Sequence, residues 1–455
     1  ARAAGALLVY AAGLTLALTA SRAGLAGGVL AVGLWLALSR QRLEGALLLL
    51  AGIVPAAAVG GWASTRPGLV DDGAGRAARV DDGALFALLG LAGAATAVLL
   101  ALVLAGIALG AERRRLLGRA AAGAAAAGVV AAVAALALAV GNPAAWAWDE
   151  FAGGGADVND PSRLTSLSSN NRAEWWGEAW RVFTAHPLGG AGAGTFEIAR
   201  LRHRDDATSV TQPHSVPLQL LAGTGAVGLA LGLAAAAALA LAAAGALRRL
   251  DGGERAAAVA LAALPAVWAL HALVDYDLDF LAVTAPALVA AAALAAAGRA
   301  AARPPGWPPV AVAAAAALAA VASFASPALS SRALDDSLAA LERGDAAAAG
   351  DAARRAQSLN PLAPEPLFAR AVAAERAGDL RAAGRLWEEA VDRQPENPET
   401  WFNLGLFRLD ALGDECGAYF ALNEAYTLDP NGRRWTPGGP LDVARAAVDR
   451  GACEP

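Results

Sequence analysis

Long runs of alanine, leucine, valine and glycine fill most of the first 326 residues of this chain, and short arginine-bearing segments separate them. A helix needs about 20 apolar residues to cross a bilayer, which is close to the length of most of these runs. Of the 455 residues, 57% are hydrophobic and only 17% are charged, which is too few charges for an ordinary soluble enzyme. We therefore expect a polytopic membrane protein in contact with a lipid bilayer.

Nine of the apolar runs are candidate membrane spans. The chain opens inside the first of them and has no initiator methionine, so we expect further spans upstream. The candidates lie near residues 3–20, 23–39, 45–62, 84–109, 120–141, 215–246, 256–274, 280–298 and 308–326.

The loops between these spans predict one orientation in the cytoplasmic (inner) membrane. Alternate loops are rich in arginine, and positively charged loops stay in the cytoplasm. The segment 142–214, the turn near 275–279 and the chain after about residue 327 then face outward. The arginines expected on the cytoplasmic side are Arg40, Arg42, Arg113, Arg114, Arg115, Arg119, Arg248, Arg249, Arg255, Arg299 and Arg303.

From about residue 333 the sequence becomes polar and periodic. Gly344, Gly378 and Gly413 are 34 and 35 residues apart. A 34-residue helix–turn–helix unit that ends in proline is typical of tetratricopeptide repeats, which stack into a concave surface for peptides or proteins. We therefore expect about three repeats that bind a protein partner. The aromatic residues predicted to pack between the helices are Trp387, Trp401, Phe402, Tyr419 and Tyr426.

These patterns predict an all-α protein with a membrane part and a repeat part. Residues 1–326 form the polytopic bundle and include the extracytoplasmic loop 142–214. Residues 331–432 form the repeats, and residues 433–455 form a C-terminal tail.

The remaining composition excludes some functions and leaves one question open. Basic and aromatic residues do not cluster as they do in nucleic-acid-binding proteins, so nucleic acid is not an expected partner. Cys416 and Cys453 lack the spacing of a metal site. They form a disulfide if their part of the chain faces an oxidising compartment, and otherwise they are two thiols.

The loop 142–214 contains the residues best suited to chemistry. Its segment 171–183 predicts an amphipathic helix with tryptophans on one face. Trp175 and Trp176 have an alternative role as interfacial anchors, because aromatic rings collect where membrane meets water. A glycine-rich turn follows this helix and permits positive φ angles and close backbone approach.

His214 lies where the chain re-enters the membrane. A histidine titrates near neutral pH and can accept a proton from a sugar hydroxyl. The structural alternative is a histidine that is hydrogen-bonded at the entry of a helix.

One motif runs from the loop 142–214 to the start of the next span. Its residues, in order, are Arg172, Trp176, Phe183, His186, Pro187, Leu188, Gly189, Gly192, Phe196 and His214. This order resembles the central motif of the O-antigen ligase/polymerase family. The Ser21-Arg22 pair at a span end and the turn 271–277 are also similar to motifs of that family, and some members of the wider superfamily carry C-terminal tetratricopeptide repeats. Ser215 departs from the family, in which asparagine usually follows the histidine.

This resemblance implies a C-type glycosyltransferase bundle that takes a glycan from a polyprenyl-diphosphate donor. The acceptor is a hydroxyl on another glycan, a lipid or a protein outside the membrane, as in cell-surface polysaccharide biosynthesis. His214 is then the general base, and Arg22 and Arg172 stabilise the diphosphate through charge-assisted hydrogen bonds, so neither a cofactor nor a metal ion is expected. The expected substrate-binding residues are Trp176, His186, Gly189, Gly192, Ser215, His271 and Asp275.

Two alternatives remain from the sequence. Asp275 and Asp277 have the spacing of a metal-dependent glycosyltransferase motif, and on a helix His271 and Asp275 share a face, where they would orient one another or bind a cation. The second alternative is a different class of protein, namely a non-catalytic scaffold or a flippase for the same lipid-linked glycan. The patterns also leave open whether transfer occurs once, as in a ligase, or repeatedly, as in a polymerase.

Overall fold

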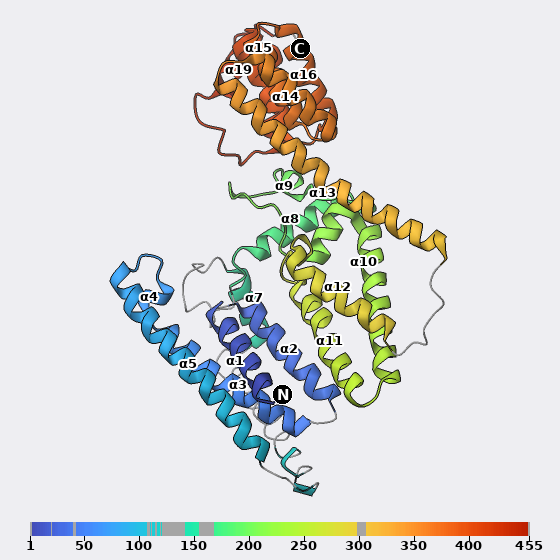
Figure 1. The fold of residues 1–455 in the computed structure, drawn as a ribbon. Helices are drawn as coiled ribbons and strands as arrows, with labels where there is room; N and C mark the ends of the chain where they lie inside the picture. Colours follow the sequence, from blue (N-terminus) through green and yellow to red (C-terminus); the bar gives the residue numbers. More distant parts are fainter. Residues whose placement is uncertain are drawn as a thin grey trace. The chain divides into compact units, whose positions relative to one another are not determined.

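The structure is a computed structural model of the 455-residue chain. It describes all residues except 1, 20, 40–41, 107–109, 111, 114–115, 119, 121–141, 154–167, 298–305 and 454–455. Helices and turns make up the described residues, which contain no β-strand (Figure 1). The predicted all-α, polytopic class is confirmed.

The chain divides into two compact units. Unit 1 comprises residues 1–180, 213–221 and 226–298, and unit 2 comprises residues 181–212, 222–225 and 299–455. The helices that lie in or begin in unit 1 are α1 (Arg2–Leu18), α2 (Arg22–Leu38), α3 (Arg42–Ala63), α4 (Pro67–Val70), α5 (Arg76–Gly106), α7 (Pro143–Ala152), α8 (Arg172–Ala185), α10 (Val216–Arg249), α11 (Gly252–His271), a 3₁₀ turn (Asp277–Asp279) and α12 (Leu281–Ala296).

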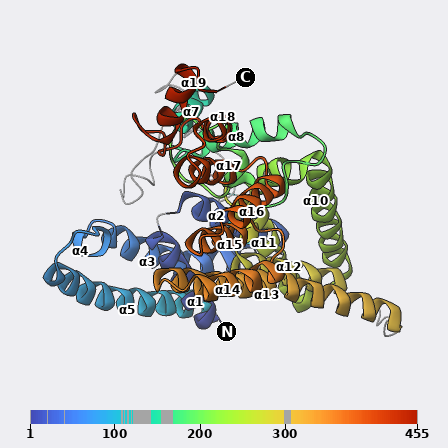
Figure 2. The ribbon, with the colours of Figure 1, turned by 90° about the horizontal axis from the view of Figure 1, so that it is seen from above.

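Unit 2 begins with the end of α8 and continues through a loop into a series of helix pairs. Figure 2 shows α14 to α19 following one another along the unit. Its helices are α9 (Phe196–Ala199), α13 (Trp307–Glu342), α14 (Ala346–Leu359), α15 (Glu365–Arg376), α16 (Leu380–Arg393), α17 (Pro398–Leu406), a π-helical turn (Phe407–Ala411), α18 (Glu415–Leu428) and α19 (Pro440–Asp449).

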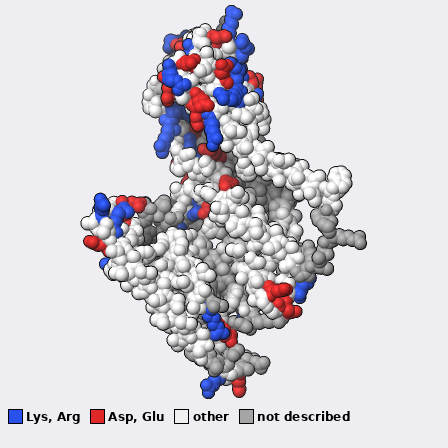
Figure 3. Space-filling view, in the orientation of Figure 1, with Lys and Arg blue, Asp and Glu red and all other residues white. Residues whose placement is uncertain are grey.

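Five described helices are long and apolar enough to cross a membrane: α3, α5, α10, α11 and α13. Three shorter apolar helices, α1, α2 and α12, correspond to other predicted spans. The span predicted at 120–141 lies almost entirely outside the described residues. The surface of the apolar helices carries few charges in Figure 3, as a lipid-facing surface requires, whereas charged side chains cover the repeats.

Small residues allow the helices of unit 1 to approach closely. A Cβ atom at Gly52 would lie 2.6 Å from the side chain of Val9, so α3 and α1 are packed closer than a larger residue permits. Gly27 likewise places α2 against Val267 of α11. Such glycine contacts are characteristic of helices that pack in a membrane, where hydrophobicity alone does not draw them together.

Glycines end the first helix of each pair in unit 2. Gly344, Gly378 and Gly413 have φ angles of 79°, 81° and 66°, which favour glycine, and an aspartate follows each of them at the start of the next helix. Helix α13 is continuous from its apolar half into the first pair, where Ser330 Oγ donates to Ala356 O at 2.8 Å.

The predicted packing residues differ in burial. Trp387 lies in the repeat core and is 4% exposed, and Trp401, Phe402 and Tyr419 pack against core clusters. Tyr426 is exposed but contacts the ring of Trp435.

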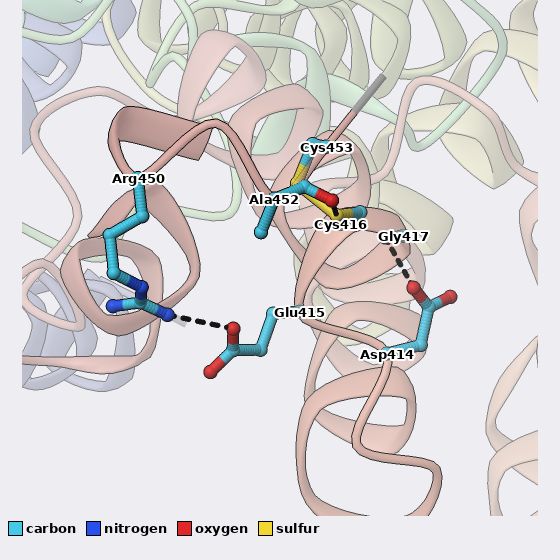
Figure 4. Close-up of a disulfide and its surroundings, with 7 residues drawn as sticks. All are labelled: Asp414, Glu415, Cys416, Gly417, Arg450, Ala452 and Cys453. Atoms are coloured by element: carbon cyan, nitrogen blue, oxygen red, sulfur yellow. Dashed lines mark hydrogen bonds and ion pairs between the residues drawn. A yellow bond between two sulfur atoms is a disulfide. The ribbon is translucent and has the colours of Figure 1, made fainter. Parts of the chain in front are cut away.

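The C-terminal end of unit 2 is closed by a disulfide. Cys416 of α18 is bonded to Cys453 (Figure 4). Beside it, Arg450, the residue that follows α19, donates to Glu415 at 2.9 Å. The question that the sequence left open is resolved in favour of pairing.

The loop of unit 2 that begins at the end of α9, residues 199–212, is fixed to the last helix pair by a buried ion pair. Arg204 donates to both carboxylate oxygens of Asp429, at 2.7 and 3.0 Å, and the two side chains are 8% and 3% exposed. Asn431 also donates to the carbonyl oxygen of Arg204 at 2.8 Å. Buried polar contacts therefore hold this loop against the repeats.

Candidate functional site

The backbone of His214 is held immediately before α10. Its φ angle is 51°, a left-handed conformation that is uncommon for residues other than glycine and that often marks functional positions. Trp176 of α8 donates from Nε1 to the carbonyl oxygen of His214 at 3.3 Å. Two residues later, Val216 N–H donates to Ala272 O, which links the start of α10 to the end of α11.

Three residues fix the imidazole ring of His214. Its Nδ1 lies 3.0 Å from Oδ1 of Asp275. Trp175 stacks on one side at a centroid distance of 4.9 Å, and Tyr276 meets the ring edge-on at 4.3 Å. A carboxylate only accepts hydrogen bonds, so the neutral ring carries its proton on Nδ1 and presents an unprotonated Nε2.

Asp275 joins His214 to an arginine. Oδ2 of Asp275 accepts from Arg172 at 3.5 Å, while Oδ1 also accepts from the backbone N–H of Tyr276 at 3.0 Å. Burial raises the pKa of Asp275, but hydrogen bonds from His214 and Tyr276 and the charge of Arg172 outweigh burial, so its pKa is lowered overall. The carboxylate is therefore ionised at neutral pH.

The local sequence explains how Arg172 reaches this position. Asn170 and Asn171 have φ angles of 51° and 66°, a conformation that asparagine tolerates better than most residues. The turn they form leads directly into α8, of which Arg172 is the first residue. Arg172 therefore stands at the end of the helix, and the next two tryptophans, Trp175 and Trp176, both contact His214.

Arg22 and Arg172 line the same pocket in unit 1, which has a volume of about 440 Å³. Ser21 caps α2 by accepting from Gly24 N–H at 3.0 Å, and Arg22 is the first residue of that helix. The guanidinium of Arg22 donates to Ser168 O at 2.7 Å. Asp275 and His271 also line this pocket.

His271 belongs to a second histidine–aspartate pair. Its Nδ1 lies 2.8 and 2.9 Å from the carboxylate oxygens of Asp277, which is 5% exposed. Helix α11 ends at His271, so the expectation that His271 and Asp275 share a helix face is wrong. The chain turns between them, and each aspartate holds a different histidine.

The glycine-rich turn lies in unit 2 and docks on a break in α10. Gly225 has a φ angle of 65°, which interrupts the helix. The N–H groups of Ala191 and Gly192 donate to the carbonyl oxygens of Ala222 and Gly223, at 2.8 and 3.0 Å. A Cβ at Gly190 would lie 2.4 Å from the backbone of Gly223, so only glycine fits there.

The predicted residues thus fall into two groups. Unit 1 brings together Arg22, Arg172, Trp176, His214, His271 and Asp275. His186, Gly189 and Gly192 belong to unit 2. Ser215 is 3% exposed and stands at the N-cap of α10, where its side chain makes no capping hydrogen bond.

Sequence reasoning missed the partners of the two histidines. The sequence pattern favours a membrane anchor or an apolar helix face for Trp175, and no motif indicates a role for Tyr276. Asp275 was identified, but its partner is His214, which is 61 residues away in the sequence. The closely spaced His271, Asp275 and Asp277 showed that the turn is polar, but not which residues pair.

Comparison with known proteins identifies a similar family for one part of the chain. The family described as O-antigen ligase matches residues 83–233, a segment that includes Arg172, His186 and His214. No curated protein matches the chain. About a third of the chain, residues 83–233, is thus similar to the O-antigen ligase family.

Proposed function

We propose that this membrane protein transfers a glycan from a polyprenyl-diphosphate donor to an acceptor hydroxyl. The observation that carries the proposal is the position of Asp275, which contacts the histidine on one side and an arginine suited to binding an anion on the other. It accepts from Nδ1 of His214 and from Arg172, and it borders the pocket that Arg22 also lines. The proposed base, His214, and the arginine proposed to bind phosphate, Arg172, are thus joined through the Asp275 carboxylate.

His214 is the general base of the reaction. The acceptor oxygen attacks the anomeric carbon of the donor glycan while Nε2 of His214 takes the hydroxyl proton. The bond between the anomeric carbon and the diphosphate oxygen breaks, and its electron pair remains on the polyprenyl diphosphate. Asp275 holds the productive tautomer of His214 and stabilises the imidazolium that forms.

Arg22, Arg172 and His271 surround the diphosphate in the unit 1 pocket. Its volume of about 440 Å³ is in the range of small-molecule sites. Guanidinium groups bind phosphate oxygens through strong, directional hydrogen bonds, so they stabilise the charge that develops on the leaving group. His271 presents Nε2, because Nδ1 is engaged by the nearly buried Asp277.

Arginine supplies the positive charge in this mechanism, so we propose transfer without a metal ion. Asp275 and Asp277 are engaged by separate histidines. Among the described residues, no group of three or more histidine, cysteine, aspartate or glutamate side chains converges as a metal site. Activity that persists in EDTA supports this part of the proposal, and activity that returns only with a divalent cation contradicts it.

The reaction takes place at the outer face of the cytoplasmic membrane, with the repeats on the same side. The arginine-rich loops predict this orientation. The Cys416–Cys453 disulfide fits an oxidising compartment, and the Arg204–Asp429 pair fixes the loop 199–212 and the repeats to each other. Protease added to sealed, right-side-out vesicles should then remove the repeats, whereas protection of the repeats contradicts this topology.

Glycan transfer in proteoliposomes tests the proposal. The purified chain is reconstituted with the host's polyprenyl-diphosphate glycan and with candidate acceptors from the same membranes. Formation of glycosylated acceptor together with free polyprenyl diphosphate is the expected result. Movement of intact lipid-linked glycan across the bilayer without transfer would instead indicate a flippase, and neither activity would indicate a scaffold.

A further inference from the structure

We propose a second saccharide-binding site in unit 2, between the segment 182–203, which contains the glycine-rich turn, and the repeats. The site is a cavity of about 310 Å³. One wall comes from the end of α8 and the segment that follows it, through His203, and the other from the turn between α16 and α17, residues 393–397. This inference rests on the proposed function for the kind of ligand, but its binding groups lie outside the donor pocket described above.

Both walls of the cavity are fixed by hydrogen bonds to neighbouring backbone. Arg181 donates to His203 O at 2.6 Å, which ties α8 to the loop. On the repeat side, Trp401 Nε1 donates to Pro395 O at 2.8 Å, and Thr400 Oγ1 donates to Gln394 O at 3.1 Å. Preformed walls lower the entropy cost of binding a ligand.

The two walls also meet through an ion pair. Arg202 of the loop contacts Glu396 of the repeats, and both residues line the cavity. The nearby Arg204–Asp429 pair is buried and strengthens the same attachment. The cavity therefore depends on both segments, which explains why neither the loop nor the repeats alone predicted it from the sequence.

The polar groups of the cavity suit an uncharged, hydroxyl-rich ligand. Arg202 and Glu396 offer adjacent donors and an acceptor whose charges balance. Burial, Arg202 and Arg181 lower the pKa of His203, so its ring is neutral at pH 7 and has one donor and one acceptor. Thr195 also lines the cavity, and its Oγ1 donates to Gly192 O at 2.7 Å; a hydroxyl oxygen that donates in this way can also accept from a ligand.

A volume of about 310 Å³ is at the lower end of ligand sites and suits a short saccharide. The donor glycan and the acceptor glycan have the same chemistry, so the cavity accepts either in principle. An effect on the Michaelis constant of the acceptor alone identifies the acceptor, and an effect on that of the donor alone identifies the donor glycan. Whether the ligand belongs to the donor glycan or to the acceptor glycan, the cavity would hold sugar residues away from the bond that reacts.

The test measures saccharide binding by the full-length chain in nanodiscs, in the absence of donor. The probe is the oligosaccharide released by mild acid from the host's lipid-linked glycan. The Arg202→Ala/Glu396→Ala variant removes both groups without changing net charge, and Arg450→Ala/Glu415→Ala removes a comparable exposed ion pair elsewhere in unit 2. We expect the first variant to bind about tenfold more weakly and the second to bind like the native chain.

Ala199→Trp provides a second test, because an indole at this lining position fills the cavity without removing a charged group. Weaker binding by both cavity variants supports the site. Native affinity in both, or no binding by the native chain, overturns it. If the native chain transfers glycan but does not bind the oligosaccharide, the inference fails while the proposed function stands. If it binds the oligosaccharide but does not transfer glycan, the binding site stands and the proposed function fails.

Discussion

Nδ1 of His214 lies 3.0 Å from Oδ1 of Asp275, across 61 residues of sequence. His214 precedes α10, and Asp275 lies in the turn after α11. A hydrogen bond from Val216 N–H to Ala272 O holds these two segments together next to the pair. Arg172 approaches the other carboxylate oxygen at 3.5 Å. A single carboxylate thus orients a histidine and faces an arginine, which is the basis of the predictions that follow.

The first prediction concerns the stability that Asp275 contributes. Its pKa is lower in the folded protein, so the ionised carboxylate favours folding at neutral pH, and this contribution disappears as the pH falls through the folded pKa. We expect the native chain to melt at a higher temperature than Asp275→Asn at pH 7. The difference should begin to shrink near the unfolded pKa, at about pH 4, and should vanish only below the lower folded pKa. Melting in detergent as a function of pH measures this. A difference that persists unchanged in acid would show that ionisation is irrelevant.

The second prediction concerns the arginines of the unit 1 pocket. Arg22→Lys and Arg172→Lys keep the charge but lose the planar, forked geometry that binds phosphate oxygens in pairs. We expect each to raise the Michaelis constant of the lipid-linked donor or to lower kcat, by about tenfold, with little effect on the acceptor. Arg385→Lys, at an exposed position of α16 outside the unit 1 pocket, is the matched control. Native donor kinetics in both pocket variants would remove the arginines from the reaction.

The third prediction separates structural from binding roles in the glycine-rich turn. At Gly190 an added Cβ collides with the backbone of Gly223, and the φ angle of 68° is unfavourable for alanine. At Gly189 an added Cβ meets no described atom within 4 Å. Gly190→Ala should therefore lower the melting temperature, with a cost of about 1–3 kcal/mol, while Gly189→Ala should not. Equal stability of the two variants would contradict the docking of this turn on α10.

The fourth prediction concerns the buried Arg204–Asp429 pair. Removing one partner leaves an uncompensated buried charge, which costs about 3–5 kcal/mol, whereas replacing both with apolar residues costs much less. We expect Arg204→Met to expose the loop 199–212 and the repeats to faster hydrogen exchange, and Arg204→Met/Asp429→Leu to recover much of the protection. If the double variant is no better protected than the single one, the two residues do not act as a pair.

The sequence was sufficient for features that arise from local patterns. Apolar run lengths predicted the long helices, and the spacing of Gly344, Gly378 and Gly413 predicted the turns within the helix pairs. The order of residues around Arg172 and His214 led to the family, which the comparison confirms for residues 83–233. These features depend on composition and spacing, which a single sequence contains.

The sequence did not predict which distant residues contact one another in the folded chain. Helix α11 ends at His271, and the turn that follows places Asp277 beside His271 and Asp275 beside His214. Residue spacing alone does not show where the helix ends. The glycine-rich turn predicted close backbone approach, but the sequence did not show that its partner is the break in α10 at Gly225. Arg204 and Asp429 are 225 residues apart, and neither belongs to a recognisable motif.

The most direct test of the account compares native protein with His214→Gln in the proteoliposome transfer assay. Glutamine keeps a polar side chain of similar reach but cannot accept a proton at neutral pH, so the variant should insert and melt like the native chain. We predict that glycan transfer falls by about 10²–10⁴-fold, with the donor still bound, because general-base catalysis is lost. A well-folded His214→Gln protein that transfers glycan at the native rate would show that His214 is structural and would contradict the mechanism.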